Sequence, residues 1–312
     1  MKSQNRSNTS TSANNSLLFS DWNSSATHYT NEVRKWTNAY RKQKSVGAKH
    51  PVHDFLFSYY SYPMGKLESW HPGLGIILEL SKEHPLPAHF SDKYYREING
   101  SIFLDPTLMK DARIPRLRWV QKLLETTAKR DASFSCFGLH EWAMVYKDLN
   151  NRHRESAPLR LSQSETEKVL ESRTVRCTHY DAFRFFNPAA KEMNKLTPSE
   201  ANRMEFEQPG CLHTNMDLYK WCYKAMPWVS SELLWQCFLL AKDVRELDMR
   251  ASPYDLTEYG LCPVKIETKQ GRAEYEHLQR EFSVRSEPLR KELIDQLDKV
   301  LNIAEGLQKS KF

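Results

Sequence analysis

Two adjacent segments in the second half of the chain have apolar residues at helical spacing. The first segment follows Pro209-Gly210, and its main apolar stripe comprises Cys211, Leu218, Cys222 and Met226. Pro227 ends it, and Ser230 is a suitable N-cap for the next segment. The second stripe, which ends before Pro253, comprises Leu233, Cys237, Leu240, Val244 and Leu247. The pattern therefore predicts two amphipathic helices joined by a short turn.

Further helices are predicted along the rest of the chain. We expect them at 50–60, at 114–129, at 140–149, after the capping box that begins at Thr197, and from Glu287 towards the C-terminus. The apolar stripe of the last helix comprises Leu289, Leu293, Leu297, Val300, Ala304 and Leu307. Such a stripe packs within the domain or pairs with a second copy, so a homodimer through the C-terminal helix is one alternative.

β-Structure is predicted in only two places. Asn99-Gly100 separates the runs 94–98 and 101–105, which is typical of a tight hairpin. Residues 175–180 predict a short strand that pairs with 159–161. The predicted fold is mainly α with minor β (α+β), a single mostly helical catalytic domain with a small β-hairpin and a long C-terminal helix. This domain spans residues 28–312, whereas residues 1–27, rich in Ser, Asn and Thr, predict a disordered tail.

The charge balance narrows the choice of partners only slightly. The chain has 45 Lys and Arg against 39 Asp and Glu, a formal net charge of +6 that permits an anionic partner without requiring one. Its apolar runs are too short for a membrane span, and the N-terminus lacks the apolar core of a signal peptide. We therefore expect no membrane partner. The six cysteines include no C-x-x-C pair, so we expect reduced thiols and a cytoplasmic location.

Ionisable side chains gather near the ends of the predicted elements, among aromatic residues. His213 and Asp217 lie one turn apart on the first helix, and Asp248 follows an arginine by one turn on the second. His179 and Asp181 point the same way if 175–180 is a strand. Each His–Asp pair suits a catalytic base with its orienting partner or two metal ligands, and the alternatives are a solvated helix face for His213 and Asp217 and a plain hydrogen bond for His179 and Asp181. Asp248 is expected at the edge of the buried face, ionised beside its arginine, with a helix-locking ion pair as the alternative. We predict that the three motifs share one pocket and that the C-terminal helix lies away from it.

Long, specific motifs occupy the stretches 50–57, 137–142, 181–186, 207–221 and 246–255. They resemble a bacterial family that carries the label 3-methyladenine DNA glycosylase, and the resemblance spans about residues 48–290. It implies a DNA-repair hydrolase that releases alkylated purine from duplex DNA without a cofactor. Aromatic side chains would hold the extruded base, while a carboxylate would stabilise the sugar cation or activate water.

The motifs supply the candidate residues for this activity. The catalytic candidates are Asp181, Asp217, Asp248, His213 and His179. The substrate-binding candidates are Arg184, Asn215, Arg250, Asp255, Trp221 and Phe185. The turn at 70–76 is similar to the phosphate-binding turn of helix-hairpin-helix glycosylases, with an ordinary tight turn as the alternative.

A second interpretation places a metal in the same region. The potential ligands are His53, His140, Glu141, His179, Asp181, His213 and Asp217. Iron or another transition metal would make the protein a non-haem-iron type oxygenase or a hydrolase, acting on a small molecule from a helical bundle. A non-enzymatic helical scaffold is the third alternative, and the dense polar motifs argue against it.

Overall fold

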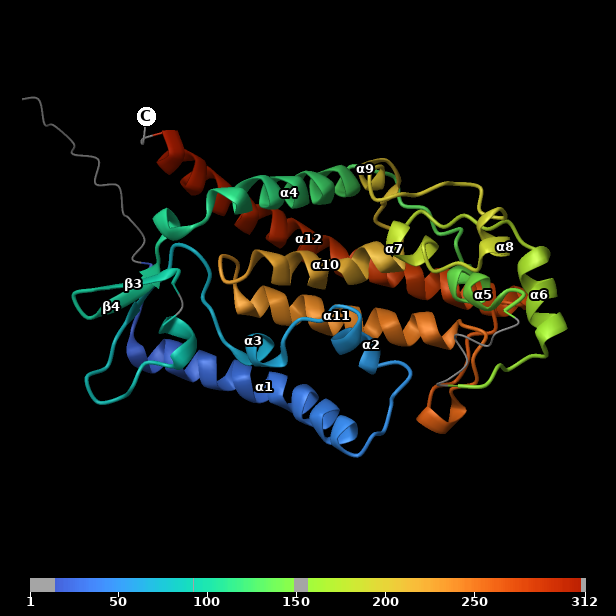
Figure 1. Cartoon of the computed structure of the whole chain (residues 1–312), viewed down its shortest axis with the longest axis horizontal. Coiled ribbons are helices and arrows are strands. Elements are labelled where there is room, and N and C mark those ends of the chain that lie inside the picture. Colours follow the sequence, from blue (N-terminus) through green and yellow to red (C-terminus); the bar gives the residue numbers. More distant parts are fainter. Residues whose placement is uncertain (1–14, 92, 149–156, 310–312) are drawn as a thin grey trace, which may run out of the picture.

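Long helices form the body of the molecule in the computed structural model, which describes residues 15–91, 93–148 and 157–309 (Figure 1). They are α1 (Phe19–Ser45), α4 (Ile114–Ala128), α10 (Leu212–Ala225), α11 (Ser231–Arg250) and α12 (Lys269–Lys309). A small sheet lies at one end of this body and several short helices gather at the other. The prediction of a mainly α fold with minor β-structure and a long C-terminal helix is confirmed.

The antiparallel pair α10 and α11 lies at the centre, and the apolar pattern predicted both helices. Cys222 and Cys237, one from each predicted stripe, are completely buried. The Ser230 hydroxyl accepts a hydrogen bond from the backbone N–H of Leu233 and so caps α11. Helix α12 packs against α4, α10 and α11, and its Leu297 is fully buried. The C-terminal stripe therefore packs within the chain itself.

Helix α1 corrects the prediction of a disordered tail over residues 1–27, because the structure places residues 19–27 in a helix. Its buried side chains are Trp22, Tyr29, Val33 and Thr37, which recur at steps of seven and four. Trp22 also donates its indole N–H to the carbonyl oxygen of Glu79, at 2.9 Å. A few large side chains at helical spacing therefore outweigh a polar composition. Residues 1–14 lie outside the described part, so their predicted disorder is not tested.

The sheet contains the predicted hairpin. Its strands are β1 (Ser16–Leu17), β2 (Ile77–Glu79), β3 (Tyr95–Ile98) and β4 (Ser101–Leu104), in the order β1-β2-β4-β3. Ile98 pairs with Ser101 across the turn, where Asn99 and Gly100 both have positive φ, as this hairpin type requires. The sheet lies at the opposite end of the body from the short helices α5 (Leu139–Val145) and α6 (Gln163–Glu171) (Figure 1).

The short elements fill the other regions. The helices are α2 (Asp54–Ser58), α3 (Met64–Glu68), α5 (Leu139–Val145), α6 (Gln163–Glu171), α7 (Tyr180–Phe183), α8 (Pro188–Lys191) and α9 (Arg203–Phe206). Turns of 3-10 helix occur at η1 (Ala88–Ser91), η2 (Pro106–Leu108), η3 (Asp111–Arg113) and η4 (Thr257–Tyr259). The predicted helices at 114–129 and 140–149 correspond to α4 and α5, although α5 ends early.

The predicted strand at 175–180 is wrong. Val175 makes one isolated bridge with Asn194, and Leu159 bridges Tyr254 instead of this segment. The amide side chain of Asn194 takes the place of a neighbouring strand: it accepts from the backbone N–H of Cys177 at 2.7 Å and donates to its carbonyl at 3.0 Å. A side chain that satisfies backbone groups in this way removes the need for a ladder.

Three helix boundaries also differ from the prediction. The expected helix at 50–60 is limited to α2. No helix begins at Thr197. The Asn202 side chain donates to the carbonyl oxygen of Thr197 and accepts from the backbone N–H of Ser199, and α9 begins only at Arg203. Helix α12 starts well before the predicted Glu287 and continues through Pro288. A proline is most common in the first turn of a helix, which is why this one suggested a start.

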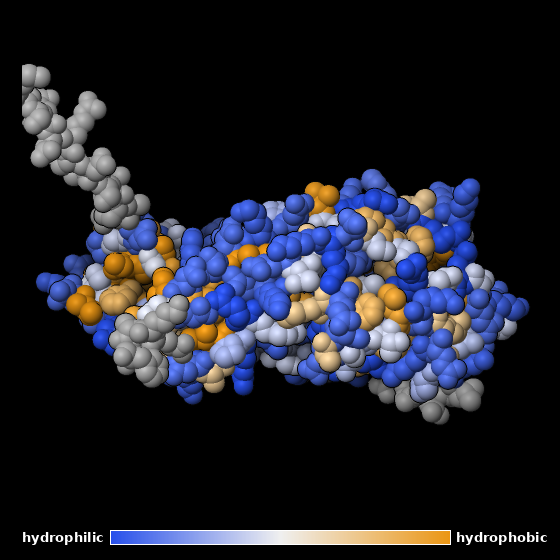
Figure 2. Space-filling model, turned by 90° about the horizontal axis from the view of Figure 1, so that it is seen from above, coloured by the Kyte–Doolittle hydropathy of each residue, from blue (hydrophilic) through white to orange (hydrophobic). Residues whose placement is uncertain are grey.

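Hydrophilic side chains cover most of the face seen in Figure 2, and hydrophobic ones form small, separate areas there. A large apolar core lies between the long helices, and a second, smaller cluster that includes Val52, Val145 and Met249 lies near the end of α11. Among the described helices, none combines the length and the apolar character that crossing a membrane would require.

Candidate functional site

Two adjoining cavities lie beside the central helix pair. The larger is a cleft of about 970 Å³ lined mainly by residues of α4 and α10, with Asp181 of α7 among the others. The smaller is a pocket of about 250 Å³ lined by residues of α2, α5, α7, α10 and α11. Tyr59 and Asp181 line both cavities, so the two spaces are neighbours. No described residue of α12 lines either one, in agreement with the expectation for the C-terminal helix.

The three predicted motifs meet next to the small pocket. His179 precedes α7, His213 lies in the first turn of α10 and Asp248 lies in the last turn of α11. The ring centroid of His213 is 5.5 Å from that of His179 and 4.4 Å from that of His140, which α5 supplies. Motifs that are far apart in sequence thus form one buried polar region.

The first group in this region is the His–His–Asp cluster, formed by His140, His213 and Asp248. Nε2 of His140 is 2.8 Å from Oδ1 of Asp248, and Nε2 of His213 is 3.9 Å from Oδ2 of the same carboxylate. The side chains of His140 and Asp248 are only 5% and 1% exposed. Each of the three residues offers one ligand atom, and these atoms lie within 4.8 Å of one another.

Two buried atoms of the His–His–Asp cluster lack a well-aligned hydrogen bond in the described protein. They are Nε2 of His140 and Oδ1 of Asp248, which are close but poorly oriented towards each other. Buried polar atoms are nearly always hydrogen-bonded, so such a pair requires an explanation. Asp248 raises the pKa of His140 against the effect of burial, so an ion pair between the two is one explanation and a shared ligand is another. Burial lowers the pKa of His213 to about 3, which keeps its imidazole neutral and able to donate a lone pair.

The Asp248 carboxylate remains ionised although it is buried. Burial raises the pKa of Asp248, but the nearby His140, His213 and Arg245 outweigh this effect and hold it below its usual range. Nη1 of Arg245 donates to Oδ2 of Asp248 at 3.1 Å and to Oε1 of Glu141 at 2.9 Å. The sequence predicted the Arg245–Asp248 pair. Glu141 binds this arginine instead of joining the cluster, which corrects its expected role as a metal ligand.

A second group, the ion-pair cluster, lies between the two cavities. Its members are His179, Asp181, Arg203, Glu207, Asp217 and Lys220. Nζ of Lys220 is 2.6 Å from Oδ2 of Asp181 and 3.0 Å from Oδ2 of Asp217. His179, Asp181 and Asp217 also lie close enough to share an ion. The Lys220 ammonium already compensates both carboxylates, so this group fits a metal less well than the His–His–Asp cluster.

The charges of the ion-pair cluster support one another. Burial raises the pKa of Asp181, but Lys220 and Arg203 outweigh it, and the pKa falls to about 2. The pKa of Asp217 is likewise held low, because Lys220 and His179 outweigh its burial. The Asp217 side chain is 2% exposed and accepts from the Tyr60 hydroxyl at 3.1 Å. The alternative that Asp217 belongs to a solvated helix face is therefore wrong.

Three of the predicted substrate-binding residues line a cavity. Arg184 and Trp221 line the cleft, and Phe185 lines the small pocket. The Arg184 guanidinium lies 4.6 Å from the Phe185 ring centroid, and its Nε is 3.3 Å from Oδ1 of Asp181. These contacts place both side chains at the junction of the two cavities.

The other three substrate-binding candidates line neither cavity, although Arg250 lines a separate pocket of about 230 Å³, so the structure does not bring them to this site. Asn215 is fully buried, and its carbonyl oxygen accepts from Ser286 and Arg290 of α12. Arg250 donates to the carbonyl of Cys262 and pairs with a glutamate of α12. Asp255 accepts from Thr257 at the start of η4. Asn215 thus joins α10 to α12, while Arg250 and Asp255 fix a helix end and a loop.

His53, another predicted metal ligand, is separate from both groups. Its Nε2 lies 3.0 Å from Oε1 of Glu246, and the two side chains are 28% and 31% exposed. The ring also contacts Trp36, with centroids 5.5 Å apart. His53 is therefore an ordinary half-buried ion-pair partner and is corrected as a ligand.

The turn at 70–76 packs against the start of α11. The backbone N–H of Leu74 donates to the carbonyl of Trp228 at 3.0 Å, and that of His71 donates to the Ser231 hydroxyl at 2.8 Å. A Cβ at Gly73, where φ is +86°, would approach the backbone N of Ser230 at 3.1 Å. These two amides are used internally, so the ordinary tight turn fits better than the phosphate-binding one.

Several residues that line the cavities or belong to the ion-pair cluster were not assigned a role from the sequence. They include Tyr59, Tyr60, Lys110, Arg116, Trp119, Arg203, Glu207 and Lys224. Glu207 lies within a recognised motif, and burial raises its pKa. The other positions resemble ordinary helix or loop residues, and only the tertiary arrangement of α4, α9, α10 and the segment after α2 brings them together.

Comparison with known proteins finds no relative: no family model, no curated protein and no solved structure matches the chain. The function is therefore argued from the geometry of the two cavities and the groups between them.

Proposed function

We propose that the chain is a metal-dependent enzyme of the non-haem iron type, with His140, His213 and Asp248 as the ligands. The observation that carries the proposal is the convergence of these side chains from three helices, with two buried atoms left without a well-aligned hydrogen bond. Two histidines and one carboxylate form the donor set of non-haem iron oxygenases. A bound iron, or another transition metal with similar preferences, would activate dioxygen or water.

The small pocket is the proposed substrate site. His213 and Glu141 line it together with apolar side chains such as Phe55 and Met249, which exclude water. Arg245 lines it as well, and its Nε has no hydrogen-bond partner in the described protein. This N–H would donate to a carbonyl or carboxylate of the substrate. The pocket volume of about 250 Å³ favours a small molecule or one end of a larger one.

Metal content tests this proposal. The protein would be purified after loading with ferrous iron, manganese or zinc, desalted, and analysed for its elements. We expect about one ion per chain, and loss of that ion in His140→Ala and His213→Ala. His53→Ala is the matched control, because His53 also faces a carboxylate but lies outside the cluster. Metal-free protein after all three loadings, or equal retention in the three variants, would reject the proposal.

A DNA glycosylase is the second candidate, and the cleft next to the pocket supports it. Basic and aromatic side chains line the cleft, as a DNA backbone would require, and a flipped base would enter the small pocket. Asp181 lines both cavities and would be the carboxylate nearest the sugar. No cofactor would take part.

Release of base from alkylated duplex DNA separates the two candidates. A glycosylase releases free methylated purine in the presence of a chelator, and His140→Ala would leave this activity largely intact. Asp181→Asn would remove it. Absence of free purine from DNA, in a protein that holds one metal ion, would leave the metalloenzyme as the better candidate.

A further inference from the structure

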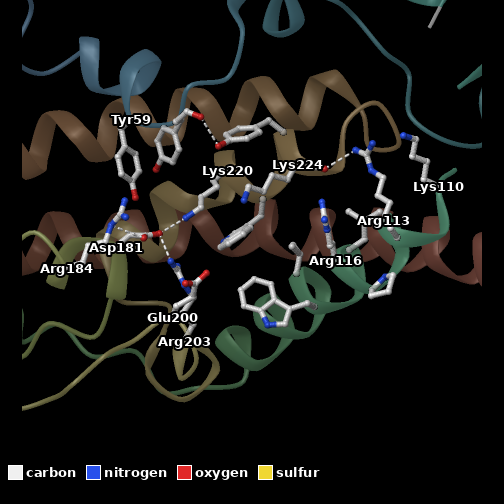
Figure 3. A pocket seen from close by; sticks show the side chains of 18 of the residues that line it. Tyr59, Lys110, Arg113, Arg116, Asp181, Arg184, Glu200, Arg203, Lys220 and Lys224 are labelled. Carbon is white, nitrogen blue, oxygen red and sulfur yellow. Dashed lines mark hydrogen bonds and ion pairs between the residues drawn. The ribbon is translucent and has the colours of Figure 1, made fainter. Parts of the chain in front are cut away.

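The larger cleft has a strong excess of positive charge. Seven basic residues line it, namely Lys110, Arg113, Arg116, Arg184, Arg203, Lys220 and Lys224, against the two acidic residues Asp181 and Glu200. Figure 3 shows Asp181 at one end, with Lys220 and Arg203 reaching towards it, and Lys110 and Arg113 near the other end. The outer cleft, defined here as the part lined by η3, the start of α4 and the end of α10, has no acidic lining residue among those described.

Some of these basic side chains already have partners. Arg203 and Lys220 pair with Asp181, and Arg113 donates to the carbonyls of Lys224 and Met226. Lys110, Arg116 and Lys224 form no ion pair with any described residue. Arg116 comes from the α4 wall and Lys224 from the α10 wall of the outer cleft. Three uncompensated cations around one space favour an anion with several oxygens.

An exposed aromatic ring lies in the same cleft. Trp119 is 38% exposed, although large apolar side chains usually bury more of their surface. The buried ring of Trp221 supports it edge-on, with centroids 5.5 Å apart and an interplanar angle of 65°. Trp119 lies one turn after Arg116 on α4. An exposed ring held by a second aromatic ring, next to cations that form no ion pair with a described residue, is suited to stack a ligand ring while the cations bind its charge.

We propose that the outer cleft is a nucleotide-binding site, in which Lys110, Arg116 and Lys224 bind phosphate and Trp119 stacks on the base. The volume of about 970 Å³ for the whole cleft is sufficient for such a ligand. The start of α4 adds the partial positive charge of a helix N-terminus. The ligand is a free mononucleotide or an unpaired nucleotide of a single strand, since both present phosphate and a bare ring face. This inference goes beyond the metal site and does not depend on it.

Calorimetric titration of the full chain, with and without added metal, tests the proposal. The probes are ATP, AMP, adenosine, inorganic phosphate, a short single-stranded oligothymidine and a duplex of similar length. We expect binding of the ligands that combine phosphate with a free base, weaker or no binding of adenosine and phosphate alone, and weakening by salt. Tighter binding of ATP than of the oligonucleotide would identify a free nucleotide as the ligand, and the reverse order a single strand. Binding of the duplex alone would overturn the proposal, because paired bases offer no face for stacking.

Variants connect the binding to the outer cleft. Arg116→Glu with Lys224→Glu should weaken binding at least roughly tenfold, and Trp119→Ala should weaken it by a similar factor. Lys42→Glu, on the exposed end of α1, is the control for each charge reversal and should leave binding unchanged. Binding that is unaffected in both cleft variants, or absent for every probe, would overturn the proposal. Metal content is measured on the same samples, so a failure here is distinct from a failure of the metal site.

Discussion

Nε2 of His140 and Oδ1 of Asp248 are 2.8 Å apart, in side chains that are 5% and 1% exposed, without the alignment of a hydrogen bond. The two atoms come from different helices, and both residues lie next to His213. A transition metal bound there would receive a lone pair from each residue, and metal binding would displace any proton on the imidazole. Removal of the Asp248 carboxylate therefore tests whether a metal binds at the His–His–Asp cluster or at the ion-pair cluster.

The first prediction compares two aspartates. Asp248→Asn should lose the bound metal, because the amide is a poor ligand, whereas Asp217→Asn should retain it, since Lys220 already occupies that carboxylate. Metal per chain after gel filtration measures the difference. Retention by Asp248→Asn with loss in Asp217→Asn would move the site to the ion-pair cluster.

The second prediction concerns Glu141, a positioning residue that acts through Arg245. Glu141→Gln keeps the shape but weakens the hold on the guanidinium that orients Asp248. We expect metal affinity to fall by roughly 10–100-fold, with the ion still bound at high concentration. Competition with a coloured chelator measures the affinity. Glu246→Gln, at a partly exposed position of α11, the helix that carries Asp248, is the control, and equal affinities in the two variants would contradict the role of Glu141.

Local patterns explain why parts of this structure were predictable. The apolar spacing and the Ser230 cap specify α10 and α11 within a few residues, and Asn99-Gly100 specifies the hairpin in the same way. The Arg245–Asp248 pair was also predictable, because residues three apart on a helix are neighbours. Each of these features depends on residues close in sequence.

The partners within the site depend on tertiary packing, and local patterns could not specify them. His53 and His140 both lie in long motifs beside acidic residues, yet only His140 meets Asp248. The strand prediction gave His179 and Asp181 the same orientation, whereas Asp181 belongs to α7. Trp119 has the spacing of an ordinary surface position, and only the contact between α4 and α10 gives it a role. The sequence therefore identified the region of the site better than its pairings.

The third prediction uses two arginines that bind the same carboxylate. Arg203 and Arg184 both pair with Asp181, but their side chains are 7% and 44% exposed. Arg203→Met leaves Asp181 and Glu207 with one fewer buried counter-charge and should lower the free energy of unfolding by roughly 3–5 kcal/mol. Arg184→Met should lower it by about 0–1 kcal/mol, because water screens the exposed pair. Urea unfolding measures both, and equal losses would show that burial does not decide the strength of these pairs.

The last prediction is a pH dependence of stability that arises far from the site, at His71. Burial lowers the pKa of this histidine from 6.5 to about 3, with a smaller contribution from His89, and its Nδ1 lies 2.8 Å from the Tyr95 hydroxyl oxygen. The unfolded chain therefore binds a proton as the pH falls below about 6.5, while the folded chain does so only near pH 3. The contribution of neutral His71 to the free energy of unfolding is fully present above pH 6.5 and is lost as the pH falls towards 3. This loss is at most about 5 kcal/mol.

His71→Gln can still bond the Tyr95 hydroxyl but cannot titrate, so its unfolding free energy should decline less between pH 7 and pH 4 than that of the native chain. Urea unfolding at several pH values measures the slope. His277→Gln, at a side chain that is 72% exposed, should keep the native slope. The prediction fails if the native chain and His71→Gln lose stability in parallel over this range, because His71 would then take up its proton equally in the folded and unfolded states.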